Sequence, residues 1–494
     1  MLYYQIIDKH PANKPAFIFK DKVTTYGELR NKIVKWAKAL QAQGIKKGDK
    51  VGLLSKNCTN FVVAYMAVIR AGGVVVPLNF QLAPREIAYI IKDAGIKVMI
   101  VRQKIELEEG LKEYGLDGSV KQLDYNDMDA LPQKDLVEHP MDEKDNCTII
   151  YTSGTTGKPK GAMLSHKNLV SNAIDFSKVV IVYPEDIALC VLPMYHCFGW
   201  TVSISENLLI GSTIVVQETY IFKDAMSLIE KHKINTFVGV PTMMQLFLKG
   251  ASSQQLQNIR FYISGGAALP QILAEEFKEK FGKPVQEGYG LSEASPVVTV
   301  NPTNKIKVGS IGPVLPNVQV EIRDEKGIEV PNGEVGELCA KGDNIMLGYL
   351  NLPEETAKTL KSGWLHTGDL AYKDEEGYIF IVDRLKDMII SSGENVYPRE
   401  IEEVLYTHPK IAEAAVIGIP DKLRGQAICA YMVLNEGETL EKKEIRKYLL
   451  ERIAAYKVPR EFFFCTQMPK NSTGKILKTA LREQALVDMV NRKR

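Results

Sequence analysis

The strongest constraint on the fold is an alternation of short apolar segments with longer amphipathic segments that continues to about Gly342. Thr25 opens a capping box with Glu28, at the start of a helical pattern that reaches Gly44. Apolar segments such as 236–240 lie between further helical patterns. Strands that alternate with helices of this length predict parallel sheets covered by helices, so we expect an α/β fold with ligands at the carboxyl ends of strands.

One predicted strand end, at 148–151, leads into a loop that reads TSGTTGKPKG. Glycines let backbone N–H groups face an anion, and the hydroxyl and ammonium groups add donors and charge. The spacing excludes a Walker loop, because Pro159 stands five positions after Gly154 and also follows Lys158, where a hydroxyl residue is required. The loop therefore predicts a phosphate site of another kind, with a plain surface hairpin as the alternative.

Composition narrows the classes of function. A chain of 494 residues exceeds the usual size of one domain. The net charge of +2 argues against a nucleic-acid or acidic-membrane partner. Seven scattered cysteines without a CxxC pair indicate reduced thiols and a cytoplasmic location. No apolar run approaches the ~20 residues of a membrane span, and the first residues do not resemble a secretory leader.

The sequence changes in character after Gly342. Residues 363–383 read as strands and turns, and the segment beyond them as a small domain of helices and strands. Between two apolar runs stands the charged segment DRLKD, from Asp383 to Asp387, which is typical of a hinge. We predict an N-terminal domain of residues 1–383 and a C-terminal domain of residues 384–494.

Six segments, in order and spacing, resemble the core motifs of the acyl-adenylate-forming superfamily: YTSGTTGKPKGAMLSH, PMYHCFGW, QEGYGLSEA, GWLHTGDL, DRLKDMIISSGENVYPREIE and PKNSTGKILK. That superfamily includes acyl- and aryl-CoA synthetases, peptide-synthetase adenylation domains and beetle luciferases. The chain is most similar to the fatty-acyl-CoA ligases. The resemblance implies a large N-terminal domain of layered sheets and helices, and a small mobile C-terminal α+β lid that turns about Lys386.

The resemblance also implies a reaction and its co-substrates. A carboxylic acid, here a medium- to long-chain fatty acid, reacts with ATP to give acyl-AMP and pyrophosphate, and coenzyme A then takes the acyl group and releases AMP. Magnesium is implied at Glu293 with Thr155, since Mg²⁺ usually binds through one or two carboxylates plus phosphates. The partners are therefore small molecules, and we expect a monomer or homodimer.

The nucleotide positions follow from the matching motifs. The glycine loop is implied to hold the β- and γ-phosphates. The GYGLSE motif is implied to hold adenine and the α-phosphate, and an aspartate and an arginine are implied to hold the ribose. Most members of the superfamily carry Thr where this chain has Ser292, and serine keeps the hydroxyl group. Read alone, Tyr289 could be a core aromatic and Asp369 a turn residue. The implied residues are Thr152, Ser153, Gly154, Thr155, Thr156, Lys160, Gly265, Gly266, Ala267, Gly288, Tyr289, Gly290, Ser292, Asp369 and Arg384.

Catalysis is implied at Lys475, whose ammonium can offset the repulsion between a carboxylate and the α-phosphate; taken alone it is an ordinary surface lysine. His196 is implied to orient the acid or to contact the acyl group, with a satisfied core histidine as the alternative. It stands where amino-acid-activating relatives have an aspartate, which argues against amino-acid substrates. Trp200 is implied at the mouth of an acyl tunnel, with plain core as the alternative. The apolar pocket candidates are Val240, Met243, Met244, Ala268 and Val297, and the small residues expected along the thiol path are Ser391, Ser392 and Gly393.

Several functions remain open at this point. An aryl- or other carboxylate–CoA ligase and an enzyme that loads a carrier protein share the same first half-reaction. A nucleotide-binding scaffold without activity is the non-enzymatic alternative, although the intact Lys475, Glu293 and Asp369 argue against it. Luciferase activity is more remote, because a fold does not fix function. The length of the acyl chain is not predicted, since one methylene in an apolar pocket is worth only about 1–3 kcal/mol.

Overall fold

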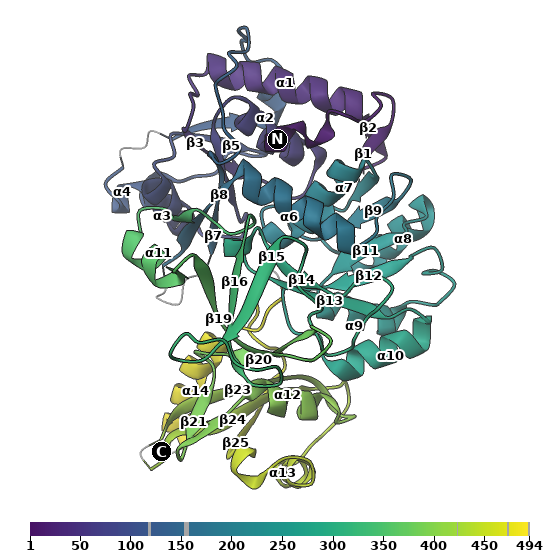
Figure 1. Cartoon of the computed structure of the whole chain (residues 1–494), viewed down its shortest axis with the longest axis vertical. Helices are drawn as coiled ribbons and strands as arrows, with labels where there is room; N and C mark the ends of the chain where they lie inside the picture. The colour runs from purple at the N-terminus through teal and green to yellow at the C-terminus, as the bar shows by residue number, and fades with distance from the viewer. Residues whose placement is uncertain (117–119, 153–157, 422, 472–473, 493–494) are drawn as a thin grey trace.

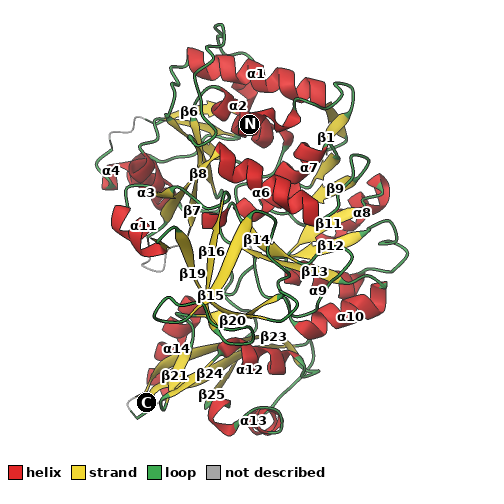
Figure 2. Ribbon diagram, viewed as in Figure 1, coloured by secondary structure: helices red, strands yellow, loops and turns green. Residues whose placement is uncertain are grey.

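The computed structural model describes residues 1–116, 120–152, 158–421, 423–471 and 474–492. In this part of the chain the strands form four sheets. Figure 1 shows the N-terminal elements at one end of the long axis and the last sheet, with β23 and β24, at the other end. Helices flank the strands of the upper two sheets (Figure 2).

The first sheet has seven strands in the order β17-β8-β7-β4-β3-β5-β6. Its inner strands run parallel, whereas β8 and β17 at one edge are antiparallel. The strands are β3 (Lys50–Leu54), β4 (Val74–Leu78), β5 (Val98–Val101), β6 (Lys121–Asp124), β7 (Asn146–Thr152), β8 (Lys160–Ser165) and β17 (Gly348–Tyr349). The helices of this region are α1 (Tyr26–Ala42), α2 (Thr59–Arg70), α3 (Pro84–Ala94), α4 (Glu108–Glu113) and α5 (Tyr125–Met128).

The second sheet has eight strands in the order β14-β13-β12-β11-β9-β10-β1-β2, and only its edge strands β14 and β2 pair antiparallel. The strands are β1 (Pro15–Phe19), β2 (Lys22–Thr25), β9 (Ile187–Cys190), β10 (Thr213–Val216), β11 (Thr236–Gly239), β12 (Phe261–Ser264), β13 (Val285–Gly290) and β14 (Val297–Val300). Its helices are α6 (His166–Val179), α7 (Glu206–Ile210), α8 (Phe222–His232), α9 (Pro241–Gly250) and α10 (Gln271–Phe281).

Helix α2 explains how these two sheets share a core. Its residues from Phe61 to Ile69 are all fully buried. A helix that is apolar on every side must be surrounded by protein, and α2 packs against α1, the strands β3 and β4 of the first sheet, and β1 of the second. At the start of α1 the predicted capping box forms, with Thr25 and Glu28 each accepting from the other's backbone N–H.

The strands of the third and fourth sheets pair antiparallel, apart from the parallel pair β24–β25. The third consists of β15 (Val318–Arg323), β16 (Gly336–Gly342), β18 (Leu360–Lys361), β19 (Trp364–Lys373) and β20 (Ile379–Arg384), beside α11 (Pro353–Thr359). The fourth consists of β21 (Ile389–Ser391), β22 (Glu394–Val396), β23 (Ile411–Asp421), β24 (Gly425–Leu434) and β25 (Glu461–Phe464), with α12 (Pro398–Tyr406), α13 (Lys442–Leu450) and α14 (Lys478–Arg492).

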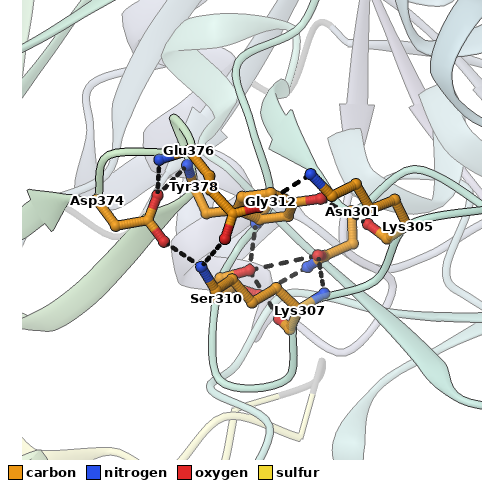
Figure 3. Close-up of polar contacts among 8 residues, drawn as sticks. All are labelled: Asn301, Lys305, Lys307, Ser310, Gly312, Asp374, Glu376 and Tyr378. Carbon is orange, nitrogen blue, oxygen red and sulfur yellow. Dashed lines mark hydrogen bonds and ion pairs between the residues drawn. The ribbon is translucent and has the colours of Figure 1, made fainter.

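A polar cluster attaches the β19–β20 turn to the loop that follows β14 (Figure 3). Lys307 pairs with Asp374 at 2.5 Å and with Glu376 at 2.9 Å, and the hydroxyl of Tyr378 donates to the carbonyl of Lys305 at 2.8 Å. The backbone N–H of Ile379 also donates to Gly312 O. Exposed ion pairs contribute little by themselves, so the backbone and hydroxyl hydrogen bonds dominate this attachment. It fixes the β19–β20 hairpin beside the strand pair β13–β14.

The α/β class is confirmed, as are the layered sheets and the smaller C-terminal domain. The expected run of parallel strands is interrupted at the glycine loop. That loop connects β7 to the antiparallel β8, so it is a hairpin between strands and does not lead into a helix. The charged segment 383–387 joins the end of β20 to β21.

Candidate active site

The predicted nucleotide residues gather where parallel strands end. Thr152 is the last residue of β7, and Ser264 ends β12 just before Gly265. The GYGLSE motif begins within β13 and continues through a short 3₁₀ turn that contains Glu293. These strand ends are the expected location of a ligand in an open α/β sheet.

The glycine loop lies largely outside the described residues, and with it the predicted positions Ser153, Gly154, Thr155 and Thr156. Thr152 and Lys160, at its two ends, are paired across β7 and β8. The Lys160 ammonium lies 2.6 Å from Glu355 and 5.4 Å from the centre of the Tyr349 ring. A phosphate bound by Lys160 would therefore compete with the carboxylate of Glu355.

Tyr349 connects the glycine hairpin to the predicted metal ligand. Its hydroxyl donates to Oε1 of Glu293 at 2.7 Å. Glu293 is partly exposed, and no other hydrogen bond to its carboxylate is found in the described parts of the chain. An oriented carboxylate with one oxygen left for a cation fits Mg²⁺, which prefers oxygen ligands. Sequence reasoning missed Tyr349 and Glu355, because no motif contains them and both act through contacts distant in sequence.

Asp369 is held between an aromatic and a cation. The hydroxyl of Tyr289 donates to its Oδ2 at 2.5 Å, and Nε of Arg384 donates to its Oδ1 at 2.9 Å. Burial, followed by the neighbouring charge of Asp369, raises the pKa of Tyr289 well above its ordinary value. The Asp369 side chain is almost buried, so its charge is compensated by these two donors. The three side chains come from three strands, β13, β19 and β20.

Several small residues follow β12, in the predicted nucleotide region. A Cβ atom added to Gly265 would lie 2.9 Å from Cζ of Phe198, and Gly266 adopts a left-handed φ of +77°. Bulkier residues would be strained at both positions. Gly266 and Ala268 are exposed, and Ala267 is partly exposed. Ser292 Oγ contacts Sγ of Cys197 at 3.2 Å, which brings the GYGLSE motif next to the loop that carries His196.

Lys475 approaches this site from the C-terminal domain. Surrounding protein and the charge of Arg384 lower its pKa to about 8, although the side chain keeps an exposed surface. Asp369 acts in the opposite direction and raises that pKa. The adjacent Gly474 lies beside the start of α9, which follows β11, since a Cβ added there would be 3.5 Å from Oγ1 of Thr242. The structure therefore brings the predicted catalytic lysine to the predicted nucleotide residues.

His196 interacts electrostatically with Lys475. Burial, and then the charge of Lys475, lower the pKa of His196 to about 4, so its imidazole is neutral at pH 7. The backbone N–H of Phe198 donates to Nδ1 at 3.2 Å. A neutral ring that accepts at Nδ1 carries its proton on Nε2. His196 can thus donate one hydrogen bond to a substrate oxygen.

Four of the five apolar pocket candidates are buried in one hydrophobic cluster beneath the strand ends, namely Val240, Met243, Met244 and Val297, whereas Ala268 is exposed and lies outside it. Trp200 is placed differently. It is 1% exposed, belongs to the core beside α2, and stacks on Tyr65 with 3.8 Å between ring centres. It lies in a π-helix, Gly199–Ser205. This placement favours the core interpretation of Trp200 over the tunnel mouth.

The charged connector is attached at both of its ends. On one side, the backbone N–H of Leu385 donates to Gly368 of β19 at 2.9 Å. On the other, Arg482 of α14 donates to Asp387 at 2.6 Å. Lys386 is the one residue between these two attachments, and its side chain is exposed.

The predicted thiol-path residues lie elsewhere. Ser391, Ser392 and Gly393 form the β21–β22 turn, in which Ser391 is buried and the other two are exposed. Figure 1 shows β21 at the lower end of the molecule, below β19 and β20. In this arrangement the C-terminal domain presents Lys475 to the site, and the turn stays apart from it.

The fold and site together define a nucleotide-binding α/β enzyme with a small C-terminal domain. The chain belongs to the AMP-binding enzymes: the model of that family matches residues 4–350, and the model of the AMP-binding enzyme C-terminal domain matches residues 400–475. These matches confirm the family predicted from the six motifs. They also confirm the predicted enzyme class, an AMP-forming acid–thiol ligase.

Two relatives are equally similar in sequence. The long-chain-fatty-acid–CoA ligase of Bacillus subtilis (strain 168) is 35% identical, over 96% of this chain and 92% of the relative. The feruloyl-CoA synthase of an Amycolatopsis species is also 35% identical, over 93% and 94%. Among solved structures, ATP-bound MatB from Rhodopseudomonas palustris superposes with a TM-score of 0.92 at 31% identity, covering 98% of this chain and 99% of MatB.

In the described ranges, no helix has the length and apolar character needed to cross a bilayer.

Proposed function

We propose that this enzyme activates a carboxylic acid with ATP and Mg²⁺, forming acyl-AMP and pyrophosphate, and then transfers the acyl group to coenzyme A with release of AMP. We favour a medium- to long-chain fatty acid as its substrate, in the cytoplasm. One observation supports this proposal most strongly. Lys475, from the C-terminal domain, interacts electrostatically with His196 and with the Asp369–Arg384 pair.

The first half-reaction brings a carboxylate toward the α-phosphate, and both are anions. Lys475 has a pKa of about 8, so it is mostly an ammonium at pH 7 and can contact both groups. Its attraction is strongest where protein replaces water. His196 donates from Nε2 to the acid and holds one carboxylate oxygen, while the other attacks phosphorus and pyrophosphate leaves.

The nucleotide is held by the groups around β13 and β19. Asp369 accepts the ribose hydroxyls with orientation from Arg384 and Tyr289, and the ring of Tyr289 provides a face for adenine. Glu293 holds the magnesium ion, which supplies charge neutralisation at the phosphates. Glycines at 265 and 266 leave space for the base to approach the backbone.

The second half-reaction requires another arrangement. The thiol of coenzyme A must reach the acyl carbon, whereas the Lys475 loop lies over that region. We infer that the C-terminal domain, residues 384–494, rotates about Lys386 and brings the turn of Ser391, Ser392 and Gly393 to the site. The attachments on either side of Lys386 support it as the pivot, and a change in its dihedrals would open the turn in which the backbone N–H groups of Asp387 and Met388 donate to the carbonyl of Arg384.

The acyl preference rests on the apolar, buried set of Val240, Met243, Met244 and Val297, which suits an alkyl chain. An aryl acid is the second candidate, since a feruloyl-CoA synthase is as similar to this chain as a fatty-acid ligase. Transfer to a carrier protein is the third.

One experiment separates these candidates. Pyrophosphate release and coenzyme A consumption are measured across C4 to C18 acids, with benzoate and coumarate in the same panel. A fatty-acid ligase should consume coenzyme A with alkyl acids and show an optimum in chain length. Faster turnover of the aryl acids would overturn the alkyl preference. Pyrophosphate release without coenzyme A consumption would indicate a carrier-protein acceptor, and no release with any acid would contradict the enzymatic proposal.

A further inference from the structure

Three potential metal ligands converge on the third sheet, and none of them is a residue assigned to Mg²⁺. Glu337 and Cys339 are two positions apart on β16, so they point to the same face. His366 on β19 is the direct cross-strand partner of Cys339. Their donor atoms all lie within 4.8 Å of one another.

The hydrogen bonds of this cluster leave the thiol proton of Cys339 without a good acceptor. Nδ1 of His366 lies 2.7 Å from Oε2 of Glu337 and 3.5 Å from Sγ of Cys339. If Nδ1 carries a proton, it donates to Glu337 and can share that proton with the weakly accepting sulfur, and the S–H group then has no acceptor in the cluster. If Nδ1 instead accepts from the thiol, its lone pair faces the carboxylate. In the described residues no other hydrogen bond of the Cys339 thiol is found.

A cation at the centre of the three atoms would replace the thiol proton, and each atom would then act as an electron-pair donor. Zinc bonds of about 2.3 Å to sulfur and about 2.0–2.2 Å to nitrogen and oxygen, at tetrahedral angles, separate S from N by about 3.5 Å and N from O by about 3.4 Å. The observed S···N distance already matches. The carboxylate oxygen must move about 0.7 Å farther from the nitrogen, and its distance from the sulfur, which is at most 4.8 Å, must become about 3.5 Å.

The chemistry of the three ligands selects the kind of ion. A thiolate, an imidazole and one carboxylate suit Zn²⁺ and its neighbours among the transition metals, whereas Mg²⁺ prefers oxygen alone. The side chains of His366 and Glu337 are 15% and 22% exposed, so a water molecule can complete a four-coordinate site. On binding, the metal–sulfur bond replaces the S–H bond, and the thiol proton leaves to solvent.

We propose that Glu337, Cys339 and His366 bind one divalent transition-metal ion of the Zn²⁺ class, separately from the Mg²⁺–nucleotide site. The site adjoins the ribose region: the other oxygen of Glu337, Oε1, accepts from the backbone N–H of Gly368 at 3.0 Å, one residue before Asp369. The ion therefore stabilises the segment that presents Asp369. This inference does not depend on the proposed reaction.

The test uses Co²⁺, a coloured substitute for Zn²⁺, on full-length enzyme freed of metals with a chelator and kept in excess Mg²⁺. We expect one Co²⁺ per chain, with a thiolate-to-cobalt charge-transfer band in the near ultraviolet and the visible bands of four-coordinate cobalt. Stoichiometric Zn²⁺ should remove both sets of bands. Zn²⁺ should also raise the melting temperature, because it binds only the folded site.

Matched variants assign the ligands. Cys339→Ser should abolish the charge-transfer band, and His366→Gln should weaken Zn²⁺ binding at least about tenfold, the scale for disturbing a metal site. Cys465→Ser, at a partly exposed thiol elsewhere, should leave the band unchanged. Circular dichroism of each variant checks its folding. If Cys339→Ser does not fold, the Zn²⁺ affinity of His366→Gln decides the test. The proposal is overturned if wild-type enzyme shows no charge-transfer band, if the band survives in Cys339→Ser, or if His366→Gln binds Zn²⁺ as tightly as wild type.

Discussion

Asp369 and Arg384 face each other across the β19–β20 hairpin, with Nε of Arg384 2.9 Å from Oδ1 of Asp369. Arg384 is the last residue of β20 and lies within the charged segment 383–387 that leads to the C-terminal domain. The carboxylate proposed to hold the ribose is therefore paired with a residue two positions before the proposed pivot, Lys386. If the C-terminal domain rotates as proposed, this ion pair connects its movement to the proposed nucleotide site.

The first prediction concerns the charge of Asp369. Asp369→Asn keeps the size of the side chain but removes the ionised acceptor, and it leaves Arg384 without its counter-charge. Hydrogen bonds to a charged group are worth about 1.5–3 kcal/mol, so ATP should bind about 10- to 100-fold more weakly. Calorimetric titration with ATP measures the affinity. An unchanged dissociation constant in a folded variant would show that the carboxylate does not hold the ribose.

The second prediction concerns Lys475. Lys475→Ala should lower adenylation by roughly 10²–10³, the scale for one preorganised charge-stabilising donor. Thioester formation from supplied acyl-AMP should be much less affected. Rapid-quench assays of the two half-reactions give both rates. An equal loss in the two would mean that Lys475 has a structural role.

The third prediction is the pH dependence that follows from the same lysine. Its pKa is lowered to about 8, so the ammonium is present below that pH and is lost above it. The kcat/KM for pyrophosphate release reports the free enzyme and should fall as the pH rises through about 8. The arginine of Lys475→Arg stays protonated at these pH values. The kcat/KM of this variant should therefore not fall above a pH of about 8, even if its rate is lower than that of the wild type at every pH. An unaltered fall in the arginine variant would assign it to another group.

The sequence predicted local features well and contacts across the fold poorly. The Thr25 capping box involves residues three apart, so it could be read directly. The motifs named Asp369 and Arg384 separately, but their pairing depends on the register of β19 and β20, which shifts after Leu370. Tyr349 reaches Glu293 from 56 positions away, and no local pattern marks that contact.

The interior position of Trp200 could not be predicted for a similar reason. The letters CFGW do not reveal that α2 brings Tyr65 against its ring. The convergence of Cys339 with His366 likewise requires the pairing of β16 with β19. Strand register and helix packing are set by the whole core, which a short window of sequence does not contain.

The fourth prediction tests the role of Trp200. Trp200→Ala leaves a cavity in the core beside Tyr65, and should lower the free energy of unfolding by about 3–5 kcal/mol. The activity per folded molecule and the ranking of acids should persist. Urea unfolding gives the stability, and the acid panel gives the ranking. A changed chain-length preference with little loss of stability would restore the tunnel-mouth interpretation.

The last prediction concerns a contact that holds the C-terminal domain in the orientation seen here. Helix α10 begins after Pro270 and has no side-chain cap from its own segment. Instead, Glu403 of α12 accepts the backbone N–H of Gln271 at 3.2 Å, and Arg399 lies 3.7 Å from the same carboxylate. A carboxylate at a helix N-terminus is stabilising, and this one comes from the other domain.

Rotation of the C-terminal domain would break that contact, so Glu403 favours the orientation that presents Lys475. Glu403→Ala should slow adenylation by about 2- to 10-fold, as expected for one hydrogen bond of about 0.5–1.5 kcal/mol, with little loss in thioester formation from supplied acyl-AMP. Glu400→Ala is the matched control, because Glu400 lies on the same helix and pairs with Lys457 within the C-terminal domain. Equal rates in Glu403→Ala and Glu400→Ala, or an equal decrease in both half-reactions, would show that the contact does not bias the orientation.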